Sequence, residues 1–255
     1  IAILSAVVSS ERTRQGRYYS APAQAPSSRH STPAPQGGTL WLHVGTHKTG
    51  TTSIQRALRL REAELRGAGR LLHPQENAWG LANLFIRAGL RTTPRVKQTT
   101  EPPDLAEFHR ELDAGHWQLG GADMIVSSEE FCLLRETLEA HALLSTLGQH
   151  FARIVPILVL RNDADWRASR RDQLNKSGML ELQKSLPDAA STDGEWYYDR
   201  AALLSFWRAI GPLRVIDYDA ALAAQGSILP QFAAAIEQPG LFNDLDLRLN
   251  IRSTG

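Results

Sequence analysis

A short apolar run that ends in a glycine turn and leads into an amphipathic helix pattern constrains the fold of this chain most. The run Thr39–Val44 is bounded by glycines, as is typical of a buried strand. The turn Gly45–Ser53 follows, and beyond it apolar residues recur on one helical face at Ile54, Ala57, Leu58 and Leu65. A strand, a glycine-bearing turn and a helix start in this order predict a site where backbone N–H groups and the helix dipole converge on an anion.

Further apolar runs repeat this alternation of strand and helix patterns at Met124–Val126, Ile154–Leu160 and Leu213–Ile216. Helical spacing precedes the last run at Leu203, Phe206, Trp207 and Ile210, and follows it at Leu229, Phe232, Ala233 and Ile236. Strands that alternate with amphipathic helices predict an α/β, three-layer fold with a central parallel sheet flanked by helices. Within it, Ser177–Glu195 is predicted to be a surface loop, because glycines and a proline interrupt its pattern.

The first 38 residues differ in composition from the rest of the chain. They are rich in Ser, Pro, Ala and Arg without periodicity, so we expect a disordered leader over 1–38 and one folded domain over 39–255. The apolar stretch Ile1–Val8 is far shorter than the roughly 20 residues of a membrane helix, which argues against stable membrane insertion. Four arginines and one glutamate give the leader a charge of +3, which leaves −2 for the remainder of a chain whose net charge is +1. A basic nucleic-acid-binding body is therefore excluded.

Cys132 is the single cysteine of the chain. It can form no intrachain disulfide and no cysteine-based zinc site, which favours a reducing, cytoplasmic compartment. The histidines and carboxylates show no spacing typical of metal ligands, so no metal is expected. The sequence does not indicate an oligomeric state.

The turn itself carries donors suited to a phosphate or sulfate, namely Lys48 and the Thr51 and Thr52 hydroxyls. Helix capping by threonine alone would explain neither the lysine nor the two glycines around it. The loop of nucleotide triphosphatases has its lysine directly after the second glycine, where this chain has Thr51. The stretch Lys48-Thr49-Gly50-Thr51-Thr52 instead resembles the phosphosulfate-binding loop of the sulfotransferase family that uses 3′-phosphoadenosine 5′-phosphosulfate (PAPS), and with His47 it looks like the bacterial carbohydrate-type members.

A second motif strengthens this resemblance. Arg161 ends the run Ile154–Leu160, and Ser169 stands eight positions later in the next helix pattern. In the family, an arginine and a serine at this spacing grip the 3′-phosphate of PAPS, and a guanidinium fork with a nearby hydroxyl suits that task. Tyr218, after Leu213–Ile216, matches a family tyrosine near the adenine; a core residue is the alternative for this position.

The resemblance runs from about Trp41 to about Ile236 and implies a P-loop three-layer fold for 39–255. It also implies a PAPS-binding set, which consists of Gly45, Thr46, His47, Lys48, Thr49, Gly50, Thr51, Thr52, Arg161, Ser169 and Tyr218. Members of the family usually continue into a further segment that covers the nucleotide. We therefore expect the domain to be truncated at its C-terminus.

Two residues are predicted to be catalytic. Lys48 is expected to stabilise charge on the bridging oxygen of the donor, as the resemblance also implies. Glu129 follows the run Met124–Val126, at the sheet edge where parallel-sheet ligands bind, and is our candidate general base. The alternative is that Ser128 caps the next helix and that Glu129 and Glu130 only favour its N-terminal dipole.

Other polar residues remain open alternatives for the acceptor site. His47, His73 and His116 are alternative bases, each with a simpler interpretation as a loop or surface histidine. Arg167, Arg170 and Arg171 would attract an anionic acceptor or form a solvated helix face.

These motifs together predict an enzyme that transfers a sulfuryl group from PAPS to a hydroxyl or amine acceptor, either a small molecule or a carbohydrate. A P-loop kinase with Mg²⁺ held by an acidic residue such as Glu129 is one alternative. A non-catalytic nucleotide-binding fragment is the other.

Overall fold

A computed structural model describes residues 37–87, 89–90, 106 and 121–245 of the chain. The leader predicted over 1–38, except for its last two residues, lies outside the described part, as do His116 and the last ten residues of the chain. The described residues belong to one compact unit, Pro33–Gly255.

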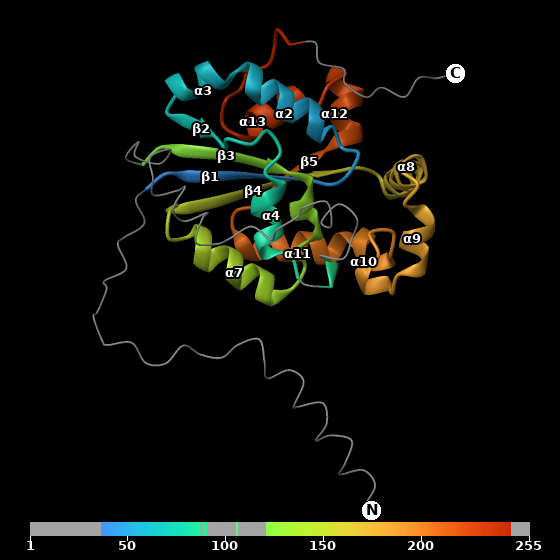
Figure 1. The fold of residues 1–255 in the computed structure, drawn as a ribbon. Helices are drawn as coiled ribbons and strands as arrows, with labels where there is room; N and C mark the ends of the chain where they lie inside the picture. Colours follow the sequence, from blue (N-terminus) through green and yellow to red (C-terminus); the bar gives the residue numbers. More distant parts are fainter. Residues whose placement is uncertain (1–36, 88, 91–105, 107–120, 246–255) are drawn as a thin grey trace, which may run out of the picture. The chain divides into compact units, whose positions relative to one another are not determined.

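The centre of this unit is a five-stranded sheet of the order β2-β3-β1-β4-β5 (Figure 1). Every pair of neighbouring strands is parallel. The strands are β1 (Thr39–Gly45), β2 (Arg70–Leu72), β3 (Asp123–Ser128), β4 (Arg153–Leu160) and β5 (Arg214–Asp217). The predicted parallel sheet is confirmed, with one short edge strand, β2, that the sequence did not indicate.

Helices cover both faces of the sheet, which completes the predicted three layers (Figure 1). They are α2 (Thr51–Leu60), α3 (Glu62–Gly67), α4 (Trp79–Phe85), α7 (Thr137–Leu147), α8 (Asp163–Lys176), α9 (Leu180–Ser185), α10 (Glu195–Tyr198), α11 (Arg200–Ile210), α12 (Tyr218–Gln225) and α13 (Leu229–Ala235). Among the described residues, the 3₁₀ helices η3 (Glu129–Leu133) and η4 (Asp188–Ala190) lie in the connections between these elements. None of the helices in the described residues is long and apolar enough to cross a membrane.

Side-chain alternation along β1 divides the core in two. Leu40, Leu42 and Val44 pack into one cluster with residues of α4, α7 and α11. Trp41 packs into the other cluster, with residues of α2 and α13. Because both faces are buried, the central strands are nearly continuous apolar runs, and this is why the sequence predicted them.

The segment Ser177–Glu195 differs from its predicted form. It contains α9 and η4, and Gln183 and Thr192 within it are buried. The prediction of a plain surface loop was therefore wrong, because this segment is held by buried polar contacts rather than by an apolar stripe.

The chain order of the strands decides where a site can form. All strands are parallel, so β1, β3, β4 and β5 end at the same edge of the sheet. The connection after β1 runs through α2 on one face, while those after β3 and β4 lead to α7 and α11 on the other face. Connections that leave neighbouring parallel strands towards opposite faces of the sheet keep the sheet edge between them open, and ligands of such sheets bind there.

Candidate functional site

The loop between β1 and α2 is fixed from within by its threonines. The Thr46 hydroxyl donates to the Val159 carbonyl of β4 over 3.1 Å, and the Thr49 hydroxyl donates to the Thr46 carbonyl over 2.5 Å. Both threonines are fully buried. Lys48 lies between them, with a positive φ of 69° and an exposed side chain. The loop thus presents its lysine to solvent from a rigid base.

Two glycines allow the loop to turn tightly. Gly50 caps α2 with φ at 78°, a left-handed conformation that favours glycine. A Cβ on Gly50 would lie 3.2 Å from both Tyr218 and Ile228, so the Tyr218 ring lies directly against this turn. A Cβ on Gly45 would overlap the Thr51 hydroxyl. Larger residues at either position would displace the loop.

Thr51, the first residue of α2, carries a buried polar atom without a partner. Its side chain is 4% exposed, and its hydroxyl makes no hydrogen bond with any described residue. An unsatisfied buried hydroxyl costs free energy unless a ligand or water completes it. At a helix N-terminus that ligand is expected to be an anion. Thr52, the next residue, is exposed.

Arg161 and Ser169 meet as their spacing predicted. Arg161 Nη1 donates to Ser169 Oγ over 2.9 Å, from the end of β4 to the second turn of α8. The guanidinium lies 5.5 Å from the Tyr218 ring centre and 3.6 Å from a carboxylate oxygen of Asp219. Its buried Nε makes no hydrogen bond within the described part of the chain. Ser169, Arg161, Tyr218 and Gly50 therefore form one continuous series of contacts along the sheet edge.

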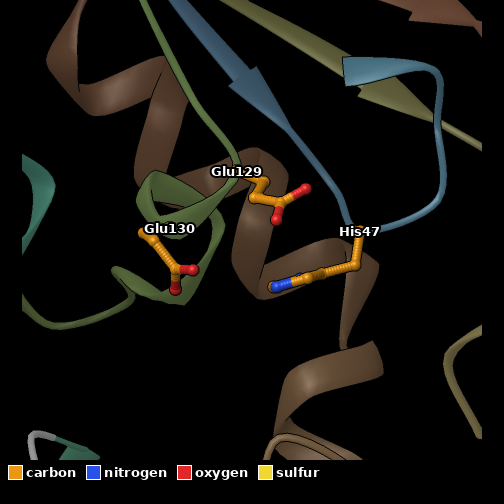
Figure 2. A group of neighbouring side chains, drawn as sticks. All are labelled: His47, Glu129 and Glu130. Carbon is orange, nitrogen blue, oxygen red and sulfur yellow. The ribbon is translucent and has the colours of Figure 1, made fainter. Parts of the chain in front are cut away.

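The end of β3 brings its carboxylates to His47. Ser128 accepts a hydrogen bond from the Glu130 backbone N–H over 3.2 Å and caps η3, so the capping role considered for Ser128 is present. A nitrogen of His47 and one carboxylate oxygen each of Glu129 and Glu130 lie within 4.8 Å of one another. Figure 2 shows the nitrogen-bearing end of the His47 ring turned towards the side where both carboxylates lie. Such a group is able to hold a proton or a cation.

Tyr197 of α10 completes this corner of the site, and no motif in the sequence pointed to it. Its hydroxyl lies 2.6 Å from His47 Nδ1, although the two residues are 150 positions apart. The Cys132 sulfur lies 3.9 Å from the same hydroxyl. Burial is the main reason that the pKa of the Cys132 thiol rises to about 12 and that the pKa of Tyr197 lies well above its usual value.

His43 lies beneath the loop and was also missed. It is fully buried in β1, with Nδ1 2.8 Å from Ser127 Oγ, while its Nε2 has no hydrogen-bond partner among the described residues. Burial lowers the pKa of His43 to about 3, so its imidazole is neutral near pH 7. A single histidine at an inward strand position carries no sequence signal that separates it from an ordinary core residue.

The arginines of α8 do not form a free anion-binding face. Arg167 makes two 2.8 Å hydrogen bonds to Glu195, and Arg171 pairs with Asp193 at 3.1 Å. Arg170 is buried and donates to the Thr192 hydroxyl over 2.6 Å. These contacts anchor the Gln183–Glu195 segment that leads into α10. Both roles considered from the sequence were therefore wrong for Arg170.

Of the other histidines proposed as bases, His73 stands apart from this corner. His73 follows β2, two strands away from β1 in the sheet order. His116 lies outside the described residues. Of the three histidines considered as alternative bases, His47 is the one that the structure places near Glu129.

Comparisons with known proteins show the fold. No family model matches the chain, and no curated protein matches it. Among solved structures, it is similar to a sulfotransferase from Alicyclobacillus acidocaldarius, with 14% identity and a TM-score of 0.53. The match covers 77% of this chain and 80% of that one. The α/β architecture with a parallel sheet flanked by helices is therefore shared with a sulfotransferase.

Proposed function

We propose that this protein is a sulfotransferase that moves a sulfuryl group from PAPS to a hydroxyl or amine acceptor, with carbohydrates among the acceptors. The β1–α2 loop acts as the P-loop of this enzyme and binds the phosphosulfate. The fold shared with a solved sulfotransferase is consistent with this proposal.

The contact series from Ser169 to Gly50 carries the proposal. The sequence motifs that hold Ser169 and Gly50 are more than a hundred positions apart, yet Arg161 and Tyr218 connect them at one sheet edge. A nucleotide with phosphates at both its 3′ and 5′ positions needs two anion sites separated by a surface for its base. The site for the 3′-phosphate is formed by Arg161 and Ser169, and the surface for the base is the Tyr218 ring. The site for the 5′ group is the loop at Gly50.

Two buried polar atoms support the fit to such a donor. The Thr51 hydroxyl and Arg161 Nε are both buried and make no hydrogen bond within the described residues. A phosphosulfate bound on the loop would accept a hydrogen bond from the Thr51 hydroxyl. A 3′-phosphate would accept a hydrogen bond from Arg161 Nε. The ion pairs of Arg161 with Asp219 and Asp165, at 3.6 and 4.0 Å, are longer than hydrogen bonds, so the guanidinium keeps donors for the ligand.

The transfer step needs charge neutralisation and a base. The acceptor oxygen forms a bond to sulfur while the bond from sulfur to the bridging oxygen breaks, and the electron pair leaves with adenosine 3′,5′-bisphosphate. Lys48 stabilises the charge that develops on that leaving oxygen. Glu129, at the end of β3, takes the proton of the acceptor.

Calorimetric titration tests the proposal. We expect adenosine 3′,5′-bisphosphate to bind without Mg²⁺, and ATP with Mg²⁺ to bind much more weakly. Binding of ATP only in the presence of Mg²⁺, with no binding of the bisphosphate, would favour the kinase alternative instead.

A further inference from the structure

The contact between His47 and Tyr197 lies at the proposed acceptor side of the site. Tyr197 comes from α10, which the arginine contacts of α8 hold in place, and it packs against Trp166 with 5.2 Å between ring centres. Both His47 and Tyr197 are buried. The 2.6 Å between the phenol oxygen and His47 Nδ1 is a short hydrogen bond in a site without solvent access to either ring.

The direction of this hydrogen bond follows from the surroundings of the phenol. A buried O–H needs an acceptor, and among the described side chains those within reach are His47 Nδ1 at 2.6 Å and Cys132 Sγ at 3.9 Å. Burial raises the pKa of the Cys132 thiol to about 12, so the thiol keeps its proton. Its sulfur lies 3.9 Å from the phenol oxygen and 3.7 Å from His47 Nδ1, so the thiol is a weak donor to either atom and a poor acceptor for the phenol. Tyr197 also keeps its proton, because burial raises its pKa. The phenol therefore donates to His47 Nδ1.

A neutral histidine that accepts at Nδ1 carries its proton on Nε2. The His47 ring is turned with its nitrogen-bearing end towards Glu129 and Glu130 (Figure 2), within the 4.8 Å group described above. The Nε2–H is then a donor on the side of the carboxylates. Because Nε2 carries this proton, it has no free lone pair with which His47 could take a proton from the substrate that accepts the sulfuryl group.

We propose that Tyr197 is a positioning residue, which fixes His47 as an Nε2–H donor towards Glu129 and Glu130 and so leaves Glu129 as the base of the reaction. The assignment of the base rests on the proposed sulfotransferase function; the tautomer of His47 does not. This inference separates two bases that the sequence left open, because it gives His47 the role of a donor and leaves proton transfer to Glu129.

The test uses nuclear magnetic resonance of the full chain with isotope-labelled histidine. The His47 signals are assigned from their loss in His47→Gln, and nitrogen shifts tell which ring nitrogen is protonated. We expect Nε2–H in the wild type and a shift towards the other tautomer in Tyr197→Phe, which removes only the hydroxyl. Tyr198→Phe is the matched control, because it removes a neighbouring hydroxyl bonded to Asp193 at 2.7 Å and leaves His47 untouched.

Activity gives the second readout. With PAPS and an acceptor, Tyr197→Phe should lower kcat about tenfold, as expected for one lost hydrogen bond, with little change in KM for the donor. Tyr198→Phe should stay within about twofold of the wild type, because it keeps the buried ring and removes a hydroxyl that bonds Asp193 rather than His47.

The outcomes separate the inference from the proposed function. An Nδ1–H tautomer of His47 in the wild type, or the same tautomer in wild type and Tyr197→Phe, overturns the positioning role. If Tyr197→Phe fails to fold, the wild type decides through the scalar coupling between the Tyr197 hydroxyl proton and His47 Nδ1, which is present only if the phenol donates to that nitrogen; its absence overturns the positioning role. Failure of the wild type to bind adenosine 3′,5′-bisphosphate would overturn the sulfotransferase proposal while the spectrum continues to report the tautomer.

Discussion

Replacement of Arg161 by glutamine should remove affinity for one phosphate of the nucleotide and spare the rest. Arg161 is one-fifth exposed, donates to Ser169 over 2.9 Å, and keeps a buried Nε without a hydrogen bond in the described residues. Hydrogen bonds to charged groups are each worth about 1.5–3 kcal/mol. One such bond to a 3′-phosphate converts to a loss of about 10- to 150-fold in affinity.

The assay compares two nucleotides that differ only in that phosphate. In calorimetry, Arg161→Gln should bind adenosine 3′,5′-bisphosphate about 10- to 150-fold more weakly and adenosine 5′-phosphate almost as the wild type does. Ser169→Ala should show the same selectivity with a smaller loss. Arg167→Gln is the matched control, because this partly buried arginine of α8 bonds Glu195 instead. Equal losses for both nucleotides would refute the assignment of Arg161 to the 3′-phosphate.

Further predictions address the loop, the base and the buried histidine. Lys48→Ala should reduce sulfuryl transfer about 10²–10³-fold and leave folding intact, since the side chain is exposed; near-normal turnover would refute its role. Glu129→Gln should lower turnover about 10²–10⁴-fold with little change in donor affinity, whereas a mere helix-start carboxylate would cost only about 0.3–1 kcal/mol of stability in a thermal melt. Burial lowers the pKa of His43 to about 3, so the unfolded chain binds a proton there below pH about 6.5 that the folded chain does not. The free energy of unfolding should therefore fall on acidification below pH about 6.5, by up to about 1.4 kcal/mol per pH unit, and His43→Gln should lose this part of the slope in denaturant titrations.

The sequence predicted those strands and helices whose own residues carry a clear apolar pattern. β1, β3 and β4 are buried on both faces, and their apolar runs stand out for that reason. β5 is buried only at Ile216, and its short apolar run was recognised because it lies between two helical patterns. β2 was missed because it is three residues long, begins with an arginine and lies at the sheet edge. The helices α9 and α10 were missed because they are only six and four residues long, and polar contacts to distant arginines hold the segment that they enclose.

The residues of the candidate site also fall into those that a local motif reveals and those that only the fold brings together. The loop around Lys48 and the pair Arg161 and Ser169 follow from short spacings, so motifs were enough to find them. The contact of Tyr197 with His47 joins residues 150 positions apart, and only the path of α8 to α10 brings them together. No local pattern encodes such a pair, because it depends on where a polar segment is anchored.

Transfer from PAPS itself tests the central claim most directly. The measurement is release of adenosine 3′,5′-bisphosphate from PAPS, without Mg²⁺, in the presence of a panel of hydroxylated sugars, alcohols and amines. The account predicts acceptor-dependent release by the wild type, with a loss of about 10²–10³-fold in Lys48→Ala. Absence of release with every acceptor, together with Mg²⁺-dependent phosphoryl transfer from ATP to the same panel, would contradict it.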